Sequence, residues 1–182
     1  GRALGADENA RRAAYTESYE EAVASGGDAV PPAAAMVRHY RKRRERAKAA
    51  EWASRLRRVD PNHRLVTLEE VDRWLSVGAP HLALALLGRA SRAKPGVPAF
   101  ARREASIRED LDDIRGQRDA LVRYLALEGS DGGRWRQLSR LALDAGDVES
   151  ALAARRSVLE YWPYSLSDRM AITRILAENG RE

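Results

Sequence analysis

The sequence predicts an all-helical protein made of repeated helix–turn–helix units, and two observations carry this prediction. Alanine, leucine and arginine are abundant, whereas only 6% of the 182 residues are aromatic, and this composition favours helices over sheet. Residues that break helices also return at a fixed interval of 34 residues or its double. The residues that keep this interval are Pro61, Pro95 and Pro163 among the prolines, and Gly78, Gly146 and Gly180 among the glycines.

Residues 132–165 show the pattern of one unit best. Apolar residues from Trp135 to Ala142 are three and four positions apart, which places them on one face of a helix. Gly146 can end this helix in a left-handed turn, and Asp147 can then cap the next helix with its side chain. Apolar spacing continues from Val148 to Leu159 until Pro163 stops the second helix.

These residues resemble the repeat of tetratricopeptide repeat (TPR) proteins. The resemblance implies an all-α fold, a right-handed α-solenoid of antiparallel helix pairs. It also implies a TPR array over 30–182, with units at about 30–63, 64–97, 98–131 and 132–165 and a half unit at 166–182, and therefore a fragment of a longer array. The recurrent tryptophan, leucine, small residue, glycine, alanine and proline of the family are matched by Trp135, Leu138, Ala142, Gly146, Ala151 and Pro163.

Three parts of the chain depart from the pattern. In the third unit the best match, Ala120 with Tyr124, lies three residues late, so we expect a longer first helix or a small insertion there. The first unit has Arg44 in place of the turn glycine, and we expect its helices to join less sharply. Residues 1–29 are expected to form an N-terminal helix, over 7–24, that is a cap or a remnant repeat, followed by a linker.

Charge and composition bear on the chemistry. The net charge is +5, but only 3 of the 32 basic residues are lysines, so 32 − 3 = 29 are arginines. Alanine and glycine are abundant as well, and an excess of arginine over lysine together with these residues is typical of proteins encoded by GC-rich genes. The arginines therefore do not indicate selection for phosphate binding, which argues against nucleic acid as the partner. The dense basic run at 38–48 either grips anionic groups or is a solvated turn.

Sequence signatures of catalysis and of bound cofactors are missing. There is no cysteine, phosphate-binding loop, paired-carboxylate signature or nucleophile elbow. The histidines at 39, 63 and 81 are too scattered for a metal site. We therefore expect no enzyme activity, no cofactor and no metal. No apolar run reaches the roughly 18 residues needed to span a bilayer, so we expect a soluble segment, in the cytoplasm or periplasm of a bacterium.

The resemblance also implies where a partner binds. In the family the outward faces of the first helices line a concave groove that holds a peptide or helix of another protein. We therefore expect a protein–protein interaction scaffold. The residues that the resemblance places in this groove are Arg38, Arg41, Lys42, Asp72, Leu75, Glu109, Asp112, Arg136, Arg140 and Arg174.

The wider setting and two alternatives follow from the same features. The Arg-, Leu- and Ala-rich repeats suggest a larger bacterial-type assembly or secretion protein, similar to arrays in exopolysaccharide export. Two other functions stay open: an accessory domain of an enzyme, such as a transferase, whose catalytic part is absent, and capture of an anionic polymer, either polysaccharide or nucleic acid. Trp52 and Trp162 are less determined by the repeat and are candidates for exposed recognition aromatics. Ile172 and Ile175 lack a partner helix, which predicts self-association through the C-terminal helix.

Overall fold

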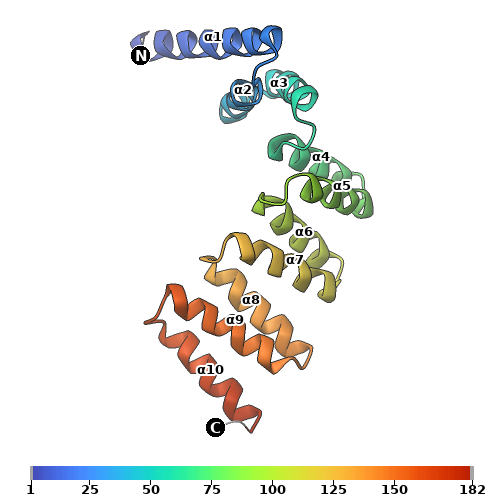
Figure 1. Ribbon diagram of the computed structural model, residues 1–182, viewed down its shortest axis with the longest axis vertical. Coiled ribbons are helices and arrows are strands. Elements are labelled where there is room, and N and C mark those ends of the chain that lie inside the picture. Colours follow the sequence, from blue (N-terminus) through green and yellow to red (C-terminus); the bar gives the residue numbers. More distant parts are fainter. Residues whose placement is uncertain (1, 181–182) are drawn as a thin grey trace. The chain divides into compact units, whose positions relative to one another are not determined.

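The computed structural model describes residues 2–180, with side chains from residue 9 onward. It contains only helices within that range (Figure 1). The chain divides into two compact units, Gly1–Ala93 and Lys94–Glu182. Unit 1 contains α1 (Arg2–Ser25), α2 (Val30–Lys42), α3 (Arg46–Val59), α4 (Arg64–Ser76) and α5 (Pro80–Ala93). Unit 2 contains α6 (Pro98–Asp110), α7 (Ile114–Leu127), α8 (Gly132–Asp144), α9 (Val148–Tyr161) and α10 (Leu166–Glu178).

The helix pairs repeat without an insertion. The first helices α2, α4, α6 and α8 have 13 residues each, and the second helices α3, α5, α7 and α9 have 14. After each first helix one residue has a positive φ, and these residues are 34 positions apart. They are Arg44 (φ 61°), Gly78 (73°), Asp112 (54°), Gly146 (73°) and Gly180 (63°).

The turn between the two helices of a pair is the same wherever it joins them. The residue after the left-handed one donates its N–H to a carbonyl in the last turn of the first helix: Glu45 to Tyr40 (3.0 Å), Ala79 to Trp74 (2.9 Å), Asp113 to Arg108 (2.9 Å) and Asp147 to Ala142 (2.8 Å). This is the Schellman arrangement, which satisfies carbonyls that the helix end leaves open. The prediction of a less sharp turn at Arg44 is therefore wrong, because the arginine adopts the conformation that glycine adopts elsewhere.

The prediction of a longer helix or insertion in the third unit is also wrong. Two polar residues there occupy positions that hold apolar residues in other units, which made the pattern look shifted. Arg108 stands one period after Trp74, and its charge is paired with Glu104 (3.0 Å) and with Asp113. Gln117 stands one period after Ala83 and is buried.

In unit 1 the core forms mainly between α2 and α3. Met36 and Val37 of α2 pack with Trp52 and Leu56 of α3, and α1 adds Tyr19, whose ring meets that of Trp52 edge-on at 5.3 Å between centroids. Trp52 is 5% exposed, so the expectation that it is an exposed aromatic is wrong. The N-terminal helix of the structure, α1, spans Arg2–Ser25, whereas the sequence predicts a helix over 7–24.

In unit 2 the core cluster lies mainly between α6 and α7, the two helices of one pair, and extends to α8 and α9. Small residues such as Ala105 and Ala120 let α6 and α7 approach closely, and larger side chains fill the space beside them. Trp135 of α8 packs at the edge of this cluster and donates its indole N–H to the Gly129 carbonyl at 2.7 Å. Asp147 accepts from the Ser150 N–H at 3.1 Å, which confirms it as the cap of α9.

Candidate functional site

Nine of the ten residues predicted for the groove lie on first helices. The exception is Asp112, which is the left-handed residue of the turn between α6 and α7. The polar residues of the third unit make its pattern look shifted by three residues. With the 34-residue period, the positions equivalent to Asp72 and Leu75 are Ser106 and Glu109. On the first helices lie Arg38, Arg41 and Lys42 (α2), Asp72 and Leu75 (α4), Glu109 (α6), Arg136 and Arg140 (α8), and Arg174 (α10).

In unit 1, Arg41 connects the two first helices. Its guanidinium donates to the Glu69 carboxylate at 2.7 Å and to the Leu65 carbonyl at 3.3 Å, both on α4. Arg38, Lys42 and Asp72 are exposed on the same two helices, and Leu75 is half-buried. Arg41 therefore stabilises the packing of α2 with α4.

Beside Arg41, the turn from α2 to α3 borders a basic cavity. The cavity has a volume of about 580 Å³ and is lined by Tyr40, Glu69 and the arginines at 41, 44 and 46. The basic run of the sequence thus places three guanidiniums around one space, with a single carboxylate among them. Such a site can attract an anionic group.

In unit 2, α8, α9 and α10 meet at a buried carboxylate. Asp168, in the first turn of α10, is 0% exposed. Arg136 of α8 grips it with two nitrogens, at 3.0 and 2.6 Å, and Arg155 of α9 donates to it at 2.7 Å. The Ser165 hydroxyl donates to it at 2.6 Å. The sequence predicts that Arg136 binds a partner. In the structure its guanidinium is bound by Asp168 instead.

Most equivalent positions of the earlier units are apolar. One period before Arg155 the sequence has Leu121, and at the position of Asp168 the earlier units have Val66, Phe100 and Arg134. The hydrogen bonds from Arg136 lower the pKa of Asp168 most, burial acts in the opposite direction, and Ser165 and Arg155 lower the pKa further. The carboxylate is therefore charged at neutral pH, and it stabilises α10 against α8 and α9.

The other predicted residues of unit 2 form the outward face of its first helices, which we call the first-helix wall: the exposed positions of α6, α8 and α10. Glu109 of α6 accepts from Gln137 of α8 at 3.1 Å, which joins the two helices across the wall. Arg140 and Arg174 stand one period apart and are exposed. Acidic residues lie at or near the C-terminal ends of the same helices: Glu109, Asp110, Asp144 and Glu178.

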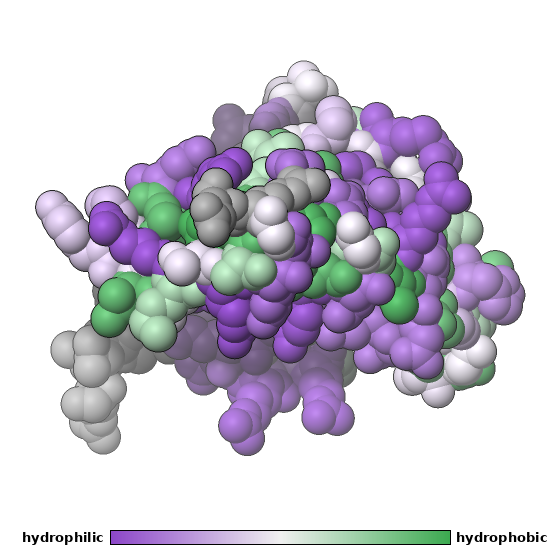
Figure 2. All heavy atoms as spheres, turned by 90° about the horizontal axis from the view of Figure 1, so that it is seen from below, coloured by the Kyte–Doolittle hydropathy of each residue, from purple (hydrophilic) through white to green (hydrophobic). Residues whose placement is uncertain are grey.

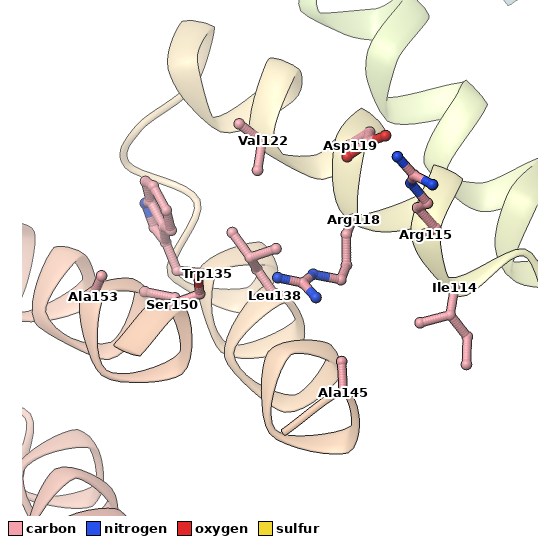
Figure 3. Close-up of a pocket in the computed structure, with 11 residues that line it drawn as sticks. Ile114, Arg115, Arg118, Asp119, Val122, Trp135, Leu138, Ala145, Ser150 and Ala153 are labelled. Carbon is pink, nitrogen blue, oxygen red and sulfur yellow. The ribbon is translucent and has the colours of Figure 1, made fainter. Parts of the chain in front are cut away.

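An apolar cleft lies on the other helices of unit 2, between α7 and α9 over the side of α8 (Figure 3). Its volume is about 690 Å³, and the lining includes Ile114, Val122 and Leu138. Ile114 and Val122 are 50% and 54% exposed. Arg118 extends from α7 toward Leu138 (Figure 3) and pairs with Asp147 at 2.8 Å. The sequence does not predict this cleft, because the apolar residues of α7 that line it are separated along the chain by charged residues such as Arg115 and Asp119.

A smaller cavity, of about 500 Å³, is lined by aromatic residues at the end of α9. Tyr161, Trp162 and Tyr164 surround it together with the start of α8. Trp162 is 43% exposed, so the prediction that it is partly exposed is confirmed.

Neither a metal-binding cluster nor a membrane-spanning helix is found among the residues that the structure describes. The described part of the chain holds no group of three or more His, Asp and Glu side chains that could bind a metal ion. His39 lies on α2, His63 caps α4 through its Nδ1, and His81 lies on α5. No described helix is long and apolar enough to cross a membrane.

The fold, but not the sequence, matches known proteins. No family model and no curated protein matches the sequence. A tetratricopeptide repeat protein from Parabacteroides merdae is 14% identical, with a TM-score of 0.55 over 90% of this chain and 61% of that one. The TPR protein TTC0263 of Thermus thermophilus is 22% identical, with a TM-score of 0.50 over 96% of each chain. MamA from Desulfovibrio magneticus is 11% identical, with a TM-score of 0.54 over 85% of this chain and 87% of that one. At these identities the matches establish a common fold, and the predicted helical-repeat fold is confirmed.

Proposed function

We propose that this chain, which has the tetratricopeptide repeat fold, is a protein-interaction scaffold that binds an acidic peptide or helix on the first-helix wall of unit 2. The proposal includes the wider setting expected from the sequence, a larger bacterial-type assembly or secretion protein. The observation that carries it is the pair of exposed arginines, Arg140 and Arg174, at equivalent positions of α8 and α10.

The arginines of the wall differ in what holds them. Arg136 is bound to the buried Asp168. Within the described residues, the one ion pair of Arg174 is with Glu178 at 4.0 Å, with both side chains mostly exposed (71% and 66%). Such surface pairs contribute little stability. Arg140 is exposed, and no ion pair of it is found within the described residues. These two guanidiniums are available to a partner.

The chemistry of such a partner follows from the guanidinium group. Each arginine offers a planar fork of donors that matches a carboxylate. Since Arg140 and Arg174 lie on neighbouring first helices, a segment that crosses both helices meets two cations. Aspartates or glutamates on that segment give it the complementary charge, which fixes its position on the wall more than it raises affinity.

A peptide library displayed on phage tests the proposal. Selection on the wild-type protein, with counter-selection on the Arg140→Glu/Arg174→Glu variant, should enrich acidic peptides. Arg156→Glu on α9, an exposed charge on a second helix, is the matched control and should keep the enriched peptides. Peptides that bind all three proteins equally would contradict the proposal.

A second candidate, capture of an anionic polymer, is favoured by the basic cavity of unit 1. Arg41, Arg44 and Arg46 line it, and Arg44 holds a left-handed conformation that costs an arginine about 1–2 kcal/mol. Binding of heparin or polyphosphate should weaken steeply with salt and should be lost in Arg44→Gly, which keeps the turn. Binding that does not depend on salt or on Arg44 would exclude this candidate.

We also propose self-association through α10, although the residues that can mediate it differ from Ile172 and Ile175, which the sequence suggested. Ile175 is 1% exposed and packs inward, whereas Leu166 and Met170 are 68% and 63% exposed. On the face drawn in Figure 2, hydrophobic residues form small groups separated by hydrophilic ones. Small patches of this kind favour weak contacts. Light scattering at high concentration should detect dimers that Met170→Lys abolishes, and a monomer at all concentrations would contradict it.

A further inference from the structure

We infer that the aromatic cavity of unit 2 is a binding site for a proline-rich peptide segment in the polyproline II conformation. The site, which we call the aromatic cradle, consists of Tyr161, Trp162, Pro163 and Tyr164, the backbone of Gly132 and Gly133, and the side chains of Arg136 and Ser165. It goes beyond the proposed function and includes neither Arg140 nor Arg174 of the first-helix wall.

Two glycines make room for the rings. A Cβ atom on Gly132 would lie 2.7 Å from Cζ3 of Trp162, and one on Gly129 would lie 2.5 Å from the Tyr161 hydroxyl. Both distances are too short for real contacts, so the indole and the phenol occupy space that any other residue would fill. The loop before α8 thus leaves room for the Tyr161 ring, and the first residue of α8 leaves room for the Trp162 ring.

The rings are held in place yet stay open to a ligand. Tyr161, Trp162 and Tyr164 are 51%, 43% and 92% exposed. The rings of Tyr161 and Trp162 have centroids 5.9 Å apart and planes inclined at 51°, so they are neither stacked nor edge-on. Two inclined aromatic faces border a trough, and exposed aromatic surface of this kind gains free energy when an apolar ring covers it.

The polar groups of the cradle favour one ligand class. Within the described residues, the Trp162 indole N–H and the Tyr164 hydroxyl make no hydrogen bond, and the nearest carboxylate, Asp168, is already bound by Arg136, Arg155 and Ser165. The cradle therefore offers an indole N–H and a phenol hydroxyl as donors, and its lining contains no carboxylate. A polyproline II segment needs donors because its carbonyls have no internal partner, and its pyrrolidine rings fit between aromatic side chains.

Competing ligands fit less well. A sugar presents hydroxyl donors that need acceptors, and a methylated ammonium needs a negative or fully caged environment. Arg136 of the lining shares the one carboxylate of Asp168 with Arg155, which leaves a net positive charge in this cluster. That charge favours an acidic residue beside the prolines. The expected occupant is thus a proline-rich segment with an adjacent aspartate or glutamate.

The test is a fluorescence anisotropy titration with a labelled oligoproline peptide that carries glutamates at its N-terminus. The full chain should bind it with saturation. Trp162→Ala should weaken binding at least about tenfold, as expected for a tryptophan at the centre of a site, and Trp162→Phe, which keeps a ring but loses the N–H, should weaken it less. Gly132→Ala should weaken it too, because the added methyl displaces the indole.

Controls separate this site from general effects. Tyr15→Ala removes an exposed aromatic residue (38%) of unit 1 and should leave the affinity unchanged. Arg140→Glu/Arg174→Glu should also retain binding, so loss of the first-helix wall and loss of the cradle are distinguishable. The inference is overturned if binding does not saturate, if folded Trp162→Ala binds like wild type, or if a peptide with glycine and serine in place of proline binds equally well.

Discussion

Replacing Asp168 by asparagine tests the role of the buried cluster that joins α8, α9 and α10. The substitution keeps the size of the side chain, removes its charge and turns one acceptor into a donor. Arg136, Arg155 and Ser165 all donate to the carboxylate. In the Asp168→Asn variant these donors face a neutral amide. The guanidiniums of Arg136 and Arg155 therefore lose the carboxylate that both of them bind.

The size of the effect follows from the exposure of the two arginines. Removing one partner of a buried ion pair costs about 3–5 kcal/mol. The Arg136 side chain is 42% exposed and can return to water, whereas that of Arg155 is 19% exposed. We therefore expect the lower end, about 3 kcal/mol. In a repeat array each element is stabilised by its neighbours, so this loss should appear as detachment of α10.

Native-state hydrogen exchange measures this directly. Amides of α10 should exchange about a hundredfold faster in Asp168→Asn, which is the rate equivalent of the expected free-energy change. Asp144→Asn removes an exposed carboxylate at the end of α8 and serves as the control, with an effect within about 0.5 kcal/mol. The variant Arg155→Leu/Asp168→Val restores the apolar character of the earlier repeats and should recover most of the protection. Exchange in Asp168→Asn that matches the control would refute the reasoning.

Three further predictions concern the turns and the caps. Arg44→Gly should raise the free energy of unfolding by up to about 1 kcal/mol, since glycine adopts φ 61° without strain; a lower melting temperature would oppose this. Gly146→Val should lower stability by more than about 1 kcal/mol, because a β-branched residue resists φ 73°, and an unchanged melting curve would count against the turn. Hydrogen bonds from Ser150, with a smaller contribution from Arg118, lower the pKa of Asp147 to about 2. The stability it provides is therefore complete above its unfolded pKa near 4 and is lost as pH falls toward 2. Circular dichroism in acid should show a shallower loss for Asp147→Asn, and identical acid profiles would contradict this.

The period of the chain could be predicted from the sequence because helix breakers and small residues mark it. The residue pattern of the third unit looks shifted by three residues for a physical reason. Arg108 and Gln117 occupy core-facing positions there, and a polar residue at such a position looks like a break in the pattern. Only the structure shows that Glu104 and Asp113 neutralise Arg108. The same limit applies to Asp112, since residue type does not reveal a left-handed conformation that glycine would normally adopt.

The binding residues could be predicted only in part. Their positions on first helices follow from the period, but whether a charge is available depends on partners far away in the sequence. Arg136 is held by a carboxylate on the next helix pair, and Arg41 is held by Glu69, so neither can be classified from spacing alone. Trp52 and Trp162 show the same limit, because Tyr19 of α1 packs on Trp52, whereas Trp162 is 43% exposed.

The central claim is that a partner binds on the first-helix wall of unit 2. Chemical-shift mapping of the ¹⁵N-labelled protein with an acidic peptide from the selection tests it most directly. We expect the largest shifts on α8 and α10 around Arg140 and Arg174, with little change on α7 and α9. Shifts concentrated on α7 and α9, around the apolar cleft that includes Ile114 and Val122, would contradict it.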